Sequence, residues 1–391
     1  MKRPIVYIPY HQKLDELCDF VFQTARVLLA RGYSVTLILY DYAYLFGDPY
    51  GREHFSDAYR QLLKHPKFSV IRPVVHITPR KGLRRLYKVS HTLFCERLVS
   101  TIARSGGMVW VFWPQDAELV HRIKRRSSNI VCLYDCVDYF TSIDPDLDKV
   151  IQKQEAELMR GCDYVFVNSH SLYQMKRTIR SDIHQVPLGF DEHSFKRAEH
   201  MSLPHIDRLF AHTPKPIIGY CGYLTFRLDY KLLMKVIVDM PKISFVFLGP
   251  TKIFPHEFLE QKTIRLIERL KSLPNVYMIP PITSKAETAR AINHFDIGII
   301  PYDRSYPFNR YCFPMKLFEY FYLGKPVVST PIEELKRLNT YVRIGKTVQE
   351  WQRHIHDMLS RHWRDSYIKE QYKLAEDNSW ENKIDMILKL L

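Results

Sequence analysis

The stretch FPMKLFEYFYLGKPVVST, residues 313–330, predicts a short helix that runs directly into a buried strand. The apolar and aromatic residues of 315–323 favour the helix, and Gly324 followed by Pro326 ends it because neither residue continues a helix well. The β-branched run at 325–330 is typical of a strand that is buried on both faces, as in a parallel sheet. The stretch therefore predicts one helix–strand unit of an α/β protein.

The same alternation of strands and helices extends along the rest of the chain. Helical stretches separate the predicted strands, which favours parallel, doubly wound sheets. A chain of 391 residues is longer than one core usually supports, so we expect two tandem Rossmann-like domains that face a cleft. The other predicted strands are 4–9, 34–40, 108–113, 130–135, 164–169, 216–222, 244–250, 275–281 and 296–302.

The alternation stops between residues 185 and 216, a segment without periodicity that contains four prolines. Proline-rich, aperiodic segments are typical of connections between domains. We therefore expect an N-terminal domain at 1–190, a linker at 191–215 and a C-terminal domain at 216–377.

Composition and charge narrow the classes of protein to which the chain could belong. Seven cysteines form no CxxC pair, and an odd number fits poorly with a disulfide framework, so we expect a cytoplasmic protein. No stretch approaches the about 18 uncharged apolar residues of a membrane span, and the N-terminus turns polar too soon for a secretory signal. The formal net charge of +15 calls for a polyanionic partner, and nucleic acid, anionic lipid and a nucleoside diphosphate all qualify.

Residues 79–104, PRKGLRRLYKVSHTLFCERLVSTIAR, form the most basic segment of the chain's first half and also carry an apolar stripe. This basic amphipathic pattern suits the inner face of an anionic membrane. It is also typical of a surface helix that packs its apolar side on its own domain, as most helices of α/β sheets do, and both interpretations stay open. The basic residues are Arg80, Lys81, Arg84, Arg85 and Lys88, and the stripe contains Leu83, Leu86, Leu93, Phe94 and Leu98.

The stretch 313–330 also holds three residues that could bind a nucleotide. Pro314 suits the first position of a helix, where free N–H groups and the helix dipole favour an anion. Lys316 adds a positive charge to the same turn, and the carboxylate of Glu319 could accept both hydrogen bonds of a ribose diol. The alternative is an ordinary amphipathic helix capped by Gly324.

This stretch resembles the donor-binding signature of GT-B glycosyltransferases, in particular the family 4-like retaining enzymes, in which Pro-x-Lys-x-x-Glu-Tyr precedes Gly-Lys-Pro-Val-Val. Further segments match that family in order, so the resemblance spans residues 130–391. It implies that a final helix at 378–391 crosses back onto the N-terminal domain. The matching segments are YDCVDYF (134–140), ELMRGCDYVFVNSHSL (157–172), VPLGFDEHSF (186–195), IGYCGYLTFRLDYKLL (218–233), LPNVYMIPP (273–281), FDIGIIPY (295–302) and NSWENKIDMIL (378–388).

The resemblance implies how the C-terminal domain holds a nucleotide-sugar donor. Gly222 would let the backbone approach the donor diphosphate, and Arg227 would bind that diphosphate together with Lys316 and the turn at Pro314. Two cations beside a leaving diphosphate can stabilise its charge without a metal. Pro281 and Ile282 would lie on the loop that meets the nucleobase, and Glu319 would bind the ribose.

The sequence departs from the family pattern at the sugar-binding end of this site. Glu319 corresponds to the second acid of a Glu-x7-Glu pattern, but the position of the first acid is Tyr311. The contacts of that first acid with the sugar hydroxyls would then fall to Asn309, Arg310, Tyr311 or the backbone around 312–313.

In the N-terminal half, YDCVDYF places Asp135 and Asp138 at the carboxyl end of a predicted strand, the edge where open α/β sheets hold ligands. A carboxylate there could deprotonate an acceptor hydroxyl or stabilise an oxocarbenium-like transition state. The alternative for Asp138 is that it caps the following turn. His11 and Lys13 lie in the loop after the first strand, where the family often contacts donor and acceptor.

The resemblance implies a metal-independent, retaining glycosyltransferase that transfers a sugar from a nucleoside-diphosphate donor to a hydroxyl of a glycan or lipid-linked acceptor. A role in cell-surface polysaccharide or glycoconjugate synthesis would fit, and we expect no cofactor besides the donor. A nucleic-acid-binding function is the less favoured explanation of the charge. The other alternative, which Tyr311 motivates, is a non-catalytic scaffold subunit that binds sugar nucleotides.

Overall fold

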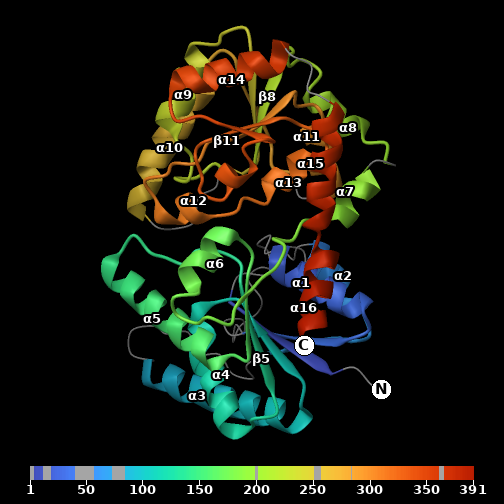
Figure 1. Ribbon diagram of the computed structural model, residues 1–391, viewed down its shortest axis with the longest axis vertical. Helices are drawn as coiled ribbons and strands as arrows, with labels where there is room; N and C mark the ends of the chain where they lie inside the picture. The colour runs from blue at the N-terminus through green and yellow to red at the C-terminus, as the bar shows by residue number, and fades with distance from the viewer. Residues whose placement is uncertain are drawn as a thin grey trace. The chain divides into compact units, whose positions relative to one another are not determined.

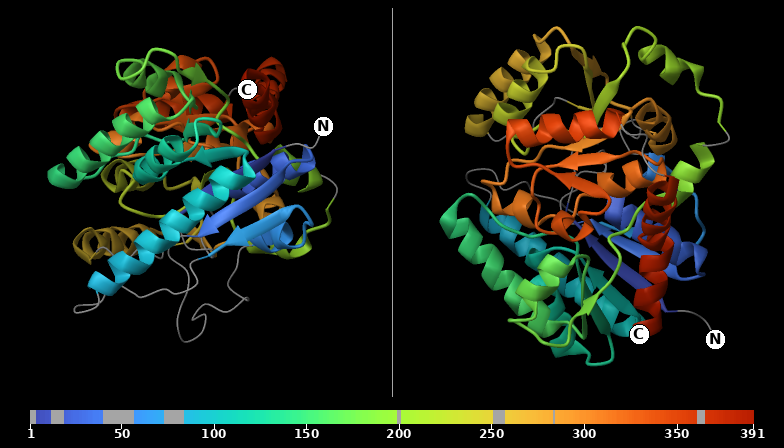
Figure 2. Two further views of the ribbon diagram at one scale, coloured as in Figure 1. Left: turned by 90° about the horizontal axis from the view of Figure 1, so that it is seen from below. Right: turned by 45° about the horizontal axis from the view of Figure 1, so that its top comes forward.

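The computed structural model describes residues 4–11, 19–39, 57–72, 84–198, 201–250, 257–282, 284–360 and 365–391. The chain divides into two compact units, Met1–Val186 with Lys383–Leu391 (unit 1) and Pro187–Asn382 (unit 2). Each unit contains one parallel β-sheet flanked by helices (Figures 1 and 2). The predicted fold class, an α/β protein with two Rossmann-like parallel sheets, is confirmed.

The sheet of unit 1 has the strand order β3-β2-β1-β4-β5-β6-β7, and every pair of neighbours is parallel. The order reverses between β1 and β4, and the carboxyl edge beside such a reversal is where open α/β sheets hold ligands. The strands are β1 (Ile5–Tyr10), β2 (Ser34–Leu39), β3 (Phe68–Ile71), β4 (Met108–Val111), β5 (Val131–Cys136), β6 (Tyr164–Val167) and β7 (His184–Gln185).

The helices of unit 1 bury their apolar sides against this sheet. The C-terminal helix α16 (Trp380–Leu390) begins in unit 2 and ends in unit 1. In unit 1 the guanidinium of Arg31 donates two hydrogen bonds of 2.8 Å to Asp385 of this helix. The other helices are α1 (Asp19–Ala30), α2 (Asp57–Leu63), α3 (Arg84–Ser105), the 3-10 turn η2 (Pro114–Asp116), α4 (Ala117–Arg126), α5 (Pro145–Gly161) and α6 (His170–Lys176).

The sheet of unit 2 repeats the pattern with the order β10-β9-β8-β11-β12-β13, again parallel throughout. Its order reverses between β8 and β11. The strands are β8 (Ile217–Cys221), β9 (Ser244–Leu248), β10 (Val276–Ile279), β11 (Ile297–Ile300), β12 (Val327–Ser329) and β13 (Val342–Ile344).

Ten helical segments accompany this sheet in the described part of unit 2, and two of them lie in the predicted linker 191–215. The prolines of that linker do not prevent helices. Pro204 occupies the first position of α8, where a backbone N–H would have no partner within the helix, so the missing N–H of proline costs nothing. Phe195, Ile206 and Phe210 are buried in the core of unit 2, so the segment is part of that unit. The segments are α7 (Glu192–Ala198), α8 (Pro204–Leu209), α9 (Tyr230–Val238), α10 (Glu257–Lys271), α11 (Lys285–Asn293), α12 (Pro307–Tyr311), α13 (Lys316–Tyr322), η3 (Leu335–Leu338), α14 (Val348–Ser360) and α15 (Asp365–Asp377).

Candidate functional site

Gly222 and Gly249 follow β8 and β9 at the carboxyl edge of the unit 2 sheet. Both have positive φ angles, 142° and 145°, and a Cβ on Gly249 would lie 2.3 Å from the carbonyl oxygen of Gly222. A Cβ on Gly222 would lie 3.4 Å from Nζ of Lys316. The two glycines therefore let the backbone segments that follow β8 and β9 approach each other closely, and they leave space beside the Lys316 ammonium.

Lys316 is the first residue of α13, and aromatic groups surround its ammonium. Its Nζ donates a short hydrogen bond to the hydroxyl of Tyr302, and it lies 4.8 Å from the centre of that ring and 5.1 Å from the centre of the Tyr220 ring. Pro314 lies two residues before α13 rather than at its first position. Its carbonyl accepts a hydrogen bond from Leu317 N, three residues later, so a tighter 3-10-like turn precedes the α-helix. Pro314 thus shapes the approach to the helix and is itself buried.

Arg227, in the loop after β8, is held in place by its contacts. Its Nε donates to Oδ1 of Asn309 at 2.9 Å, and its guanidinium carbon lies 4.5 Å from the centre of the Tyr302 ring and 4.3 Å from that of Phe308. Arg227 and Lys316 therefore both contact the ring of Tyr302. The structure brings these two predicted diphosphate ligands together at one ring, and Lys316 also lies beside Gly222.

The three predicted sugar-binding residues of α12 lie in different surroundings. Asn309 is fully buried, and its Nδ2 donates to the carbonyls of Arg227 (3.0 Å) and Asp303 (2.8 Å). Because both ends of its amide are occupied, Asn309 is placed to position Arg227 rather than to bind a sugar. Arg310 is exposed, lies over the half-buried ring of Tyr311, and pairs with Glu333 at 3.2 Å.

Glu319 lies on α13 with its carboxylate buried, and Oε1 pairs with Nζ of Lys285 at 2.9 Å. Burial and, to a smaller extent, the negative charge of Glu319 raise the pKa of the nearby Cys221 thiol to about 12. Lys285 begins α11, just after the loop with exposed Pro281 and half-buried Ile282. Lys285 was not predicted from the sequence, because nothing in its local spacing indicates a partner 34 residues away.

In unit 1, His11 follows β1 and Asp116 ends the turn η2 after β4, so the two residues flank the point where the strand order reverses. Nε2 of His11 lies 2.7 Å from Oδ1 of Asp116, which is buried. The imidazole also packs edge-on against Trp113, with ring centres 5.3 Å apart. His11 was predicted from the sequence and Asp116 was not, and Lys13 lies outside the described residues.

The two candidate acids after β5 do not lie together. Asp135 is fully buried and pairs with Nζ of Lys383, and burial raises its pKa although the lysine opposes that shift. Asp138 is half-buried, and its Oδ1 accepts from Tyr139 N at 3.0 Å. Of the two carboxylates, Asp138 is therefore the one near the surface of the carboxyl edge, and Asp135 is placed for a structural role.

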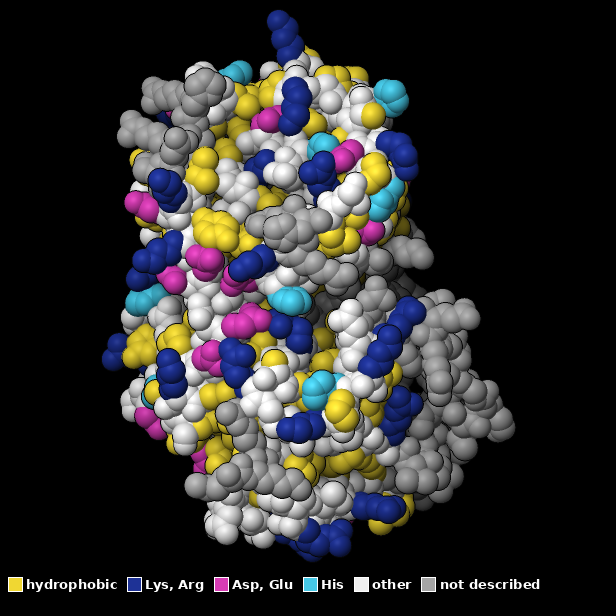
Figure 3. Space-filling model, turned by 90° about the vertical axis from the view of Figure 1, so that its right-hand side faces the viewer, with side chains coloured by type: hydrophobic (Ala, Val, Ile, Leu, Met, Phe, Trp, Pro, Cys, Tyr) yellow, Lys and Arg dark blue, Asp and Glu magenta, His cyan; other side chains and the backbone are white. Residues whose placement is uncertain are grey.

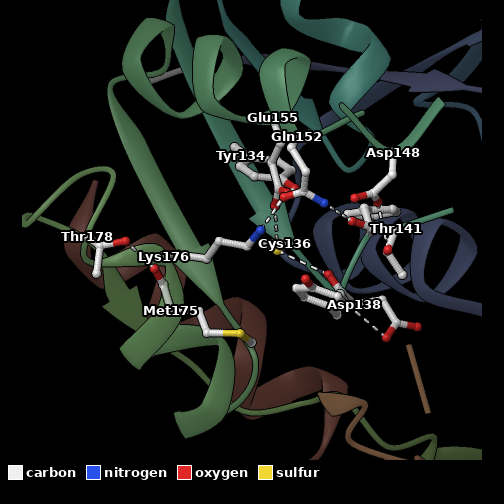
Figure 4. A network of polar contacts seen from close by, with 12 residues as sticks. Tyr134, Cys136, Asp138, Thr141, Asp148, Gln152, Glu155, Met175, Lys176 and Thr178 are labelled. Carbon is white, nitrogen blue, oxygen red and sulfur yellow. Dashed lines mark hydrogen bonds and ion pairs between the residues drawn. The ribbon is translucent and has the colours of Figure 1, made fainter. Parts of the chain in front are cut away.

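A buried polar network lies behind the loop of Asp138 (Figure 4). Nζ of Lys176 pairs with Oε2 of Glu155 at 2.5 Å, and Oε1 of Glu155 accepts from the Tyr134 hydroxyl at 3.0 Å. The Cys136 thiol donates to the carbonyl of Asp138 at 3.3 Å. This network joins α5, α6 and β5 and fixes the backbone that carries Asp138.

Of the predicted basic amphipathic segment 79–104, residues 79–83 lie outside the described residues and the rest belongs to α3. Its stripe is divided, because Leu98 is buried in the core of unit 1 whereas Leu93 is 65% exposed. Lys and Arg side chains are spread over the face in Figure 3, with Asp and Glu among them. No helix within the described ranges combines the length and the apolar character needed to cross a membrane.

The chain matches no protein-family model. It is 27% identical over 219 residues to the teichuronic acid biosynthesis glycosyltransferase TuaH of Bacillus subtilis (strain 168). This match covers 53% of the chain and 52% of the relative, so the similarity spans about half the length of each protein.

Solved structures resemble the whole chain. Sucrose-phosphate synthase from Thermosynechococcus elongatus has a TM-score of 0.74 at 15% identity, with coverage of 99% of this chain and 98% of that one. HepE from Anabaena, in complex with UDP-glucose, has a TM-score of 0.70 at 13% identity and full coverage, 100%, of both chains. These similarities confirm the predicted fold, which is that of the GT-B glycosyltransferases.

Proposed function

We propose that this protein is a glycosyltransferase that transfers a sugar from a nucleoside-diphosphate donor, bound by unit 2, to a hydroxyl of an acceptor bound by unit 1. The observation that carries the proposal is the pair Arg227 and Lys316 on the ring of Tyr302, beside the open backbone of Gly222. Two cations at the carboxyl edge of a parallel sheet suit a diphosphate. The similarity to TuaH, a glycosyltransferase by name, supports the same activity.

The rest of the donor has candidate partners around this pair. Glu319 would accept hydrogen bonds from the ribose, and its ion pair with Lys285 would orient its carboxylate. Pro281 and Ile282 would contact the nucleobase. The structures of HepE with UDP and UDP-glucose support uridine as the first base to test.

We propose further that transfer retains the anomeric configuration and needs no metal. The resemblance of 130–391 to retaining enzymes supports the first point, and the two cations beside the leaving diphosphate support the second. The proton NMR spectrum of the product would give its anomeric configuration. Turnover that survives dialysis against EDTA would support metal independence.

The acceptor would be a glycan or a lipid-linked sugar of a cell-surface polysaccharide, which the teichuronic acid role in the relative's name supports. Asp138, and His11 oriented by Asp116, are the polar groups of unit 1 that would bind its hydroxyl. The basic helix α3, with Val89 and Leu93 exposed, would contact anionic lipid at the cytoplasmic face of the membrane. Co-sedimentation with anionic liposomes, compared between the wild type and the Arg84→Glu, Arg85→Glu variant, tests this contact.

A two-step experiment tests the activity itself. Thermal shifts with the five common nucleoside diphosphates, alone and as sugar conjugates, identify the donor, because a ligand that binds the folded state raises the Tm. Release of the nucleoside diphosphate from that donor is then measured in the wild type and the Lys316→Ala variant. Turnover that Lys316→Ala abolishes supports the proposal. Tight donor binding without turnover of any donor would instead favour a scaffold subunit.

A further inference from the structure

We infer that Cys136 and Gln152 are positioning residues for the proposed reaction. Their side chains hold the backbone around Asp138, so that its carboxylate meets the acceptor hydroxyl in one fixed orientation. The inference rests on the proposed function and adds to it two residues of unit 1 that contact no substrate. Three observations carry it: the side chains that hold segment 137–140, the buried ion pair behind that segment, and the link between its backbone and the carboxylate.

Segment 137–140 follows β5 and belongs to no helix or strand. The thiol of Cys136 donates to the carbonyl of Asp138 at 3.3 Å (Figure 4). Nε2 of Gln152, on α5, donates to the carbonyl of Phe140 at 2.7 Å. The two donors thus hold the backbone at Asp138 itself and two residues later, and the path of this backbone depends on side chains rather than on a strand or a helix.

The same segment is also held from β6 and α6. Asn168 directly follows β6, is buried, and donates from Nδ2 to the carbonyl of Val137 at 2.5 Å. Nζ of Lys176, on α6, lies 5.5 Å from the centre of the Tyr139 ring, which is a cation–π distance. Each residue of segment 137–140 therefore contacts a side chain of a neighbouring element.

The buried pair of Glu155 and Lys176 connects these contacts. Glu155 is fully buried and Lys176 is 3% exposed, and Oε1 of Glu155 lies 3.5 Å from the sulfur of Cys136. The Cys136 thiol therefore bridges the ion pair to the carbonyl of Asp138 (Figure 4). Hydrogen bonds are strong in such a low-dielectric interior, so the network resists displacement of the segment.

The carboxylate of Asp138 is linked to the backbone that these side chains hold, because its Oδ1 accepts from Tyr139 N at 3.0 Å. A general base must lie within hydrogen-bond reach of the hydroxyl that it deprotonates, and a displacement of about 1 Å can cost about 100-fold in rate. Loss of one of the holding donors should therefore lower turnover. It should leave donor binding unchanged, since the proposed donor site belongs to unit 2.

The test compares variants that separate hydrogen bonding from packing. Cys136→Val keeps an apolar side chain of similar size and removes the donor, whereas Cys136→Ser keeps a donor and loses apolar character. Gln152→Leu removes the amide donor. Gln154→Leu is its matched control, because residues two apart on a helix do not share a face.

Three measurements are made on each variant, after thermal melting has shown that it folds. Turnover is the release of UDP from UDP-glucose with water as the acceptor, or from the donor that the thermal shifts identify. Calorimetry gives the Kd of UDP. Hydrogen–deuterium exchange of segment 136–142 reports how firmly the backbone is held, and this measurement does not depend on activity.

We expect Cys136→Val and Gln152→Leu to lower kcat about tenfold or more and to exchange faster in this segment, with the Kd of UDP within about twofold of the wild type. Cys136→Ser should keep kcat within about threefold of the wild type, although serine fills an apolar space less well than valine. The reverse order of serine and valine overturns the inference. Equal effects of Gln152→Leu and Gln154→Leu, or lower turnover without faster exchange, overturn it as well.

The outcome for the wild type separates the inference from the function on which it rests. If the wild type turns over a donor and neither Cys136→Val nor Gln152→Leu changes the rate, the inference fails and the proposed glycosyltransferase activity stands. If the wild type turns over no donor, the proposed activity fails and the inference fails with it.

Discussion

Nζ of Lys383 lies 2.9 Å from Oδ1 of Asp135, and both side chains are completely buried within unit 1. Lys383 comes from the C-terminal helix α16 and Asp135 from near the end of strand β5, 248 residues apart in sequence. A buried carboxylate that is committed to a lysine is not available to a substrate. Asp135 therefore attaches α16 to the sheet, which favours a structural role for this carboxylate.

We expect Lys383→Met to destabilise the protein by about 3–5 kcal/mol, because it leaves the carboxylate of Asp135 buried without its partner. The control is Asp385→Asn on the same helix, which breaks the half-exposed pair with Arg31 and should cost at most about 1 kcal/mol. Urea unfolding followed by tryptophan fluorescence measures both. Similar, small losses for the two variants would contradict the structural role of the Lys383–Asp135 pair.

Asp138→Asn should lower turnover by about 100-fold or more if the carboxylate acts on the acceptor hydroxyl, the usual range for a lost general base. The asparagine can still accept the hydrogen bond from Tyr139 N, so the loop keeps its local contact. Steady-state rates with saturating donor are the measurement, and Asp146→Asn, an exposed acid on α5, is the control. A rate within a factor of about two of the wild type would leave Asp138 as a turn-capping residue.

Glu319→Ala should weaken nucleoside-diphosphate binding by about 1–3 kcal/mol, the usual cost of losing a charged hydrogen-bond acceptor. Because Glu319 is assigned to the ribose, the affinity for inorganic pyrophosphate should not change. Calorimetry with both ligands separates the two contributions. An equal loss for pyrophosphate would mean that Glu319 acts on the diphosphate cations instead, and no loss for either ligand would remove the ribose assignment.

The sequence predicted the features that depend on local pattern. Alternating strands and helices indicated both sheets, and the stretch at 313–330 indicated Lys316 and Glu319 on one helix. Lys285 and Asp116 were missed because each meets its partner only through the fold, 34 and 105 residues away in sequence. Asn309 was assigned to the sugar from its position alone, since only the structure shows that both ends of its amide are occupied.

Acid should remove the stabilisation that Asp207 provides in unit 2. The hydrogen bonds from Arg290 and, to a smaller extent, the one with His294 lower the pKa of Asp207 from 3.8 to about 2. Because the folded-state pKa lies below the unfolded value, this stabilisation is fully present above about pH 4 and is lost as the pH falls towards 2. Asp207→Asn should therefore lower the Tm at pH 6, and the difference from the wild type should shrink between pH 4 and pH 2. A difference that does not depend on pH would contradict this ion pair.

Asn309→Ala should weaken diphosphate binding although Asn309 contacts no ligand in this scheme. The substitution removes the acceptor that holds Nε of Arg227 at 2.9 Å, so the guanidinium is held less firmly beside the rings of Tyr302 and Phe308. Asn309→Ala combined with Arg227→Ala should bind UDP no more weakly than Arg227→Ala alone, because both changes remove the same interaction. Additive losses in this double-mutant cycle would show that Asn309 binds the donor independently of Arg227, as a sugar contact would.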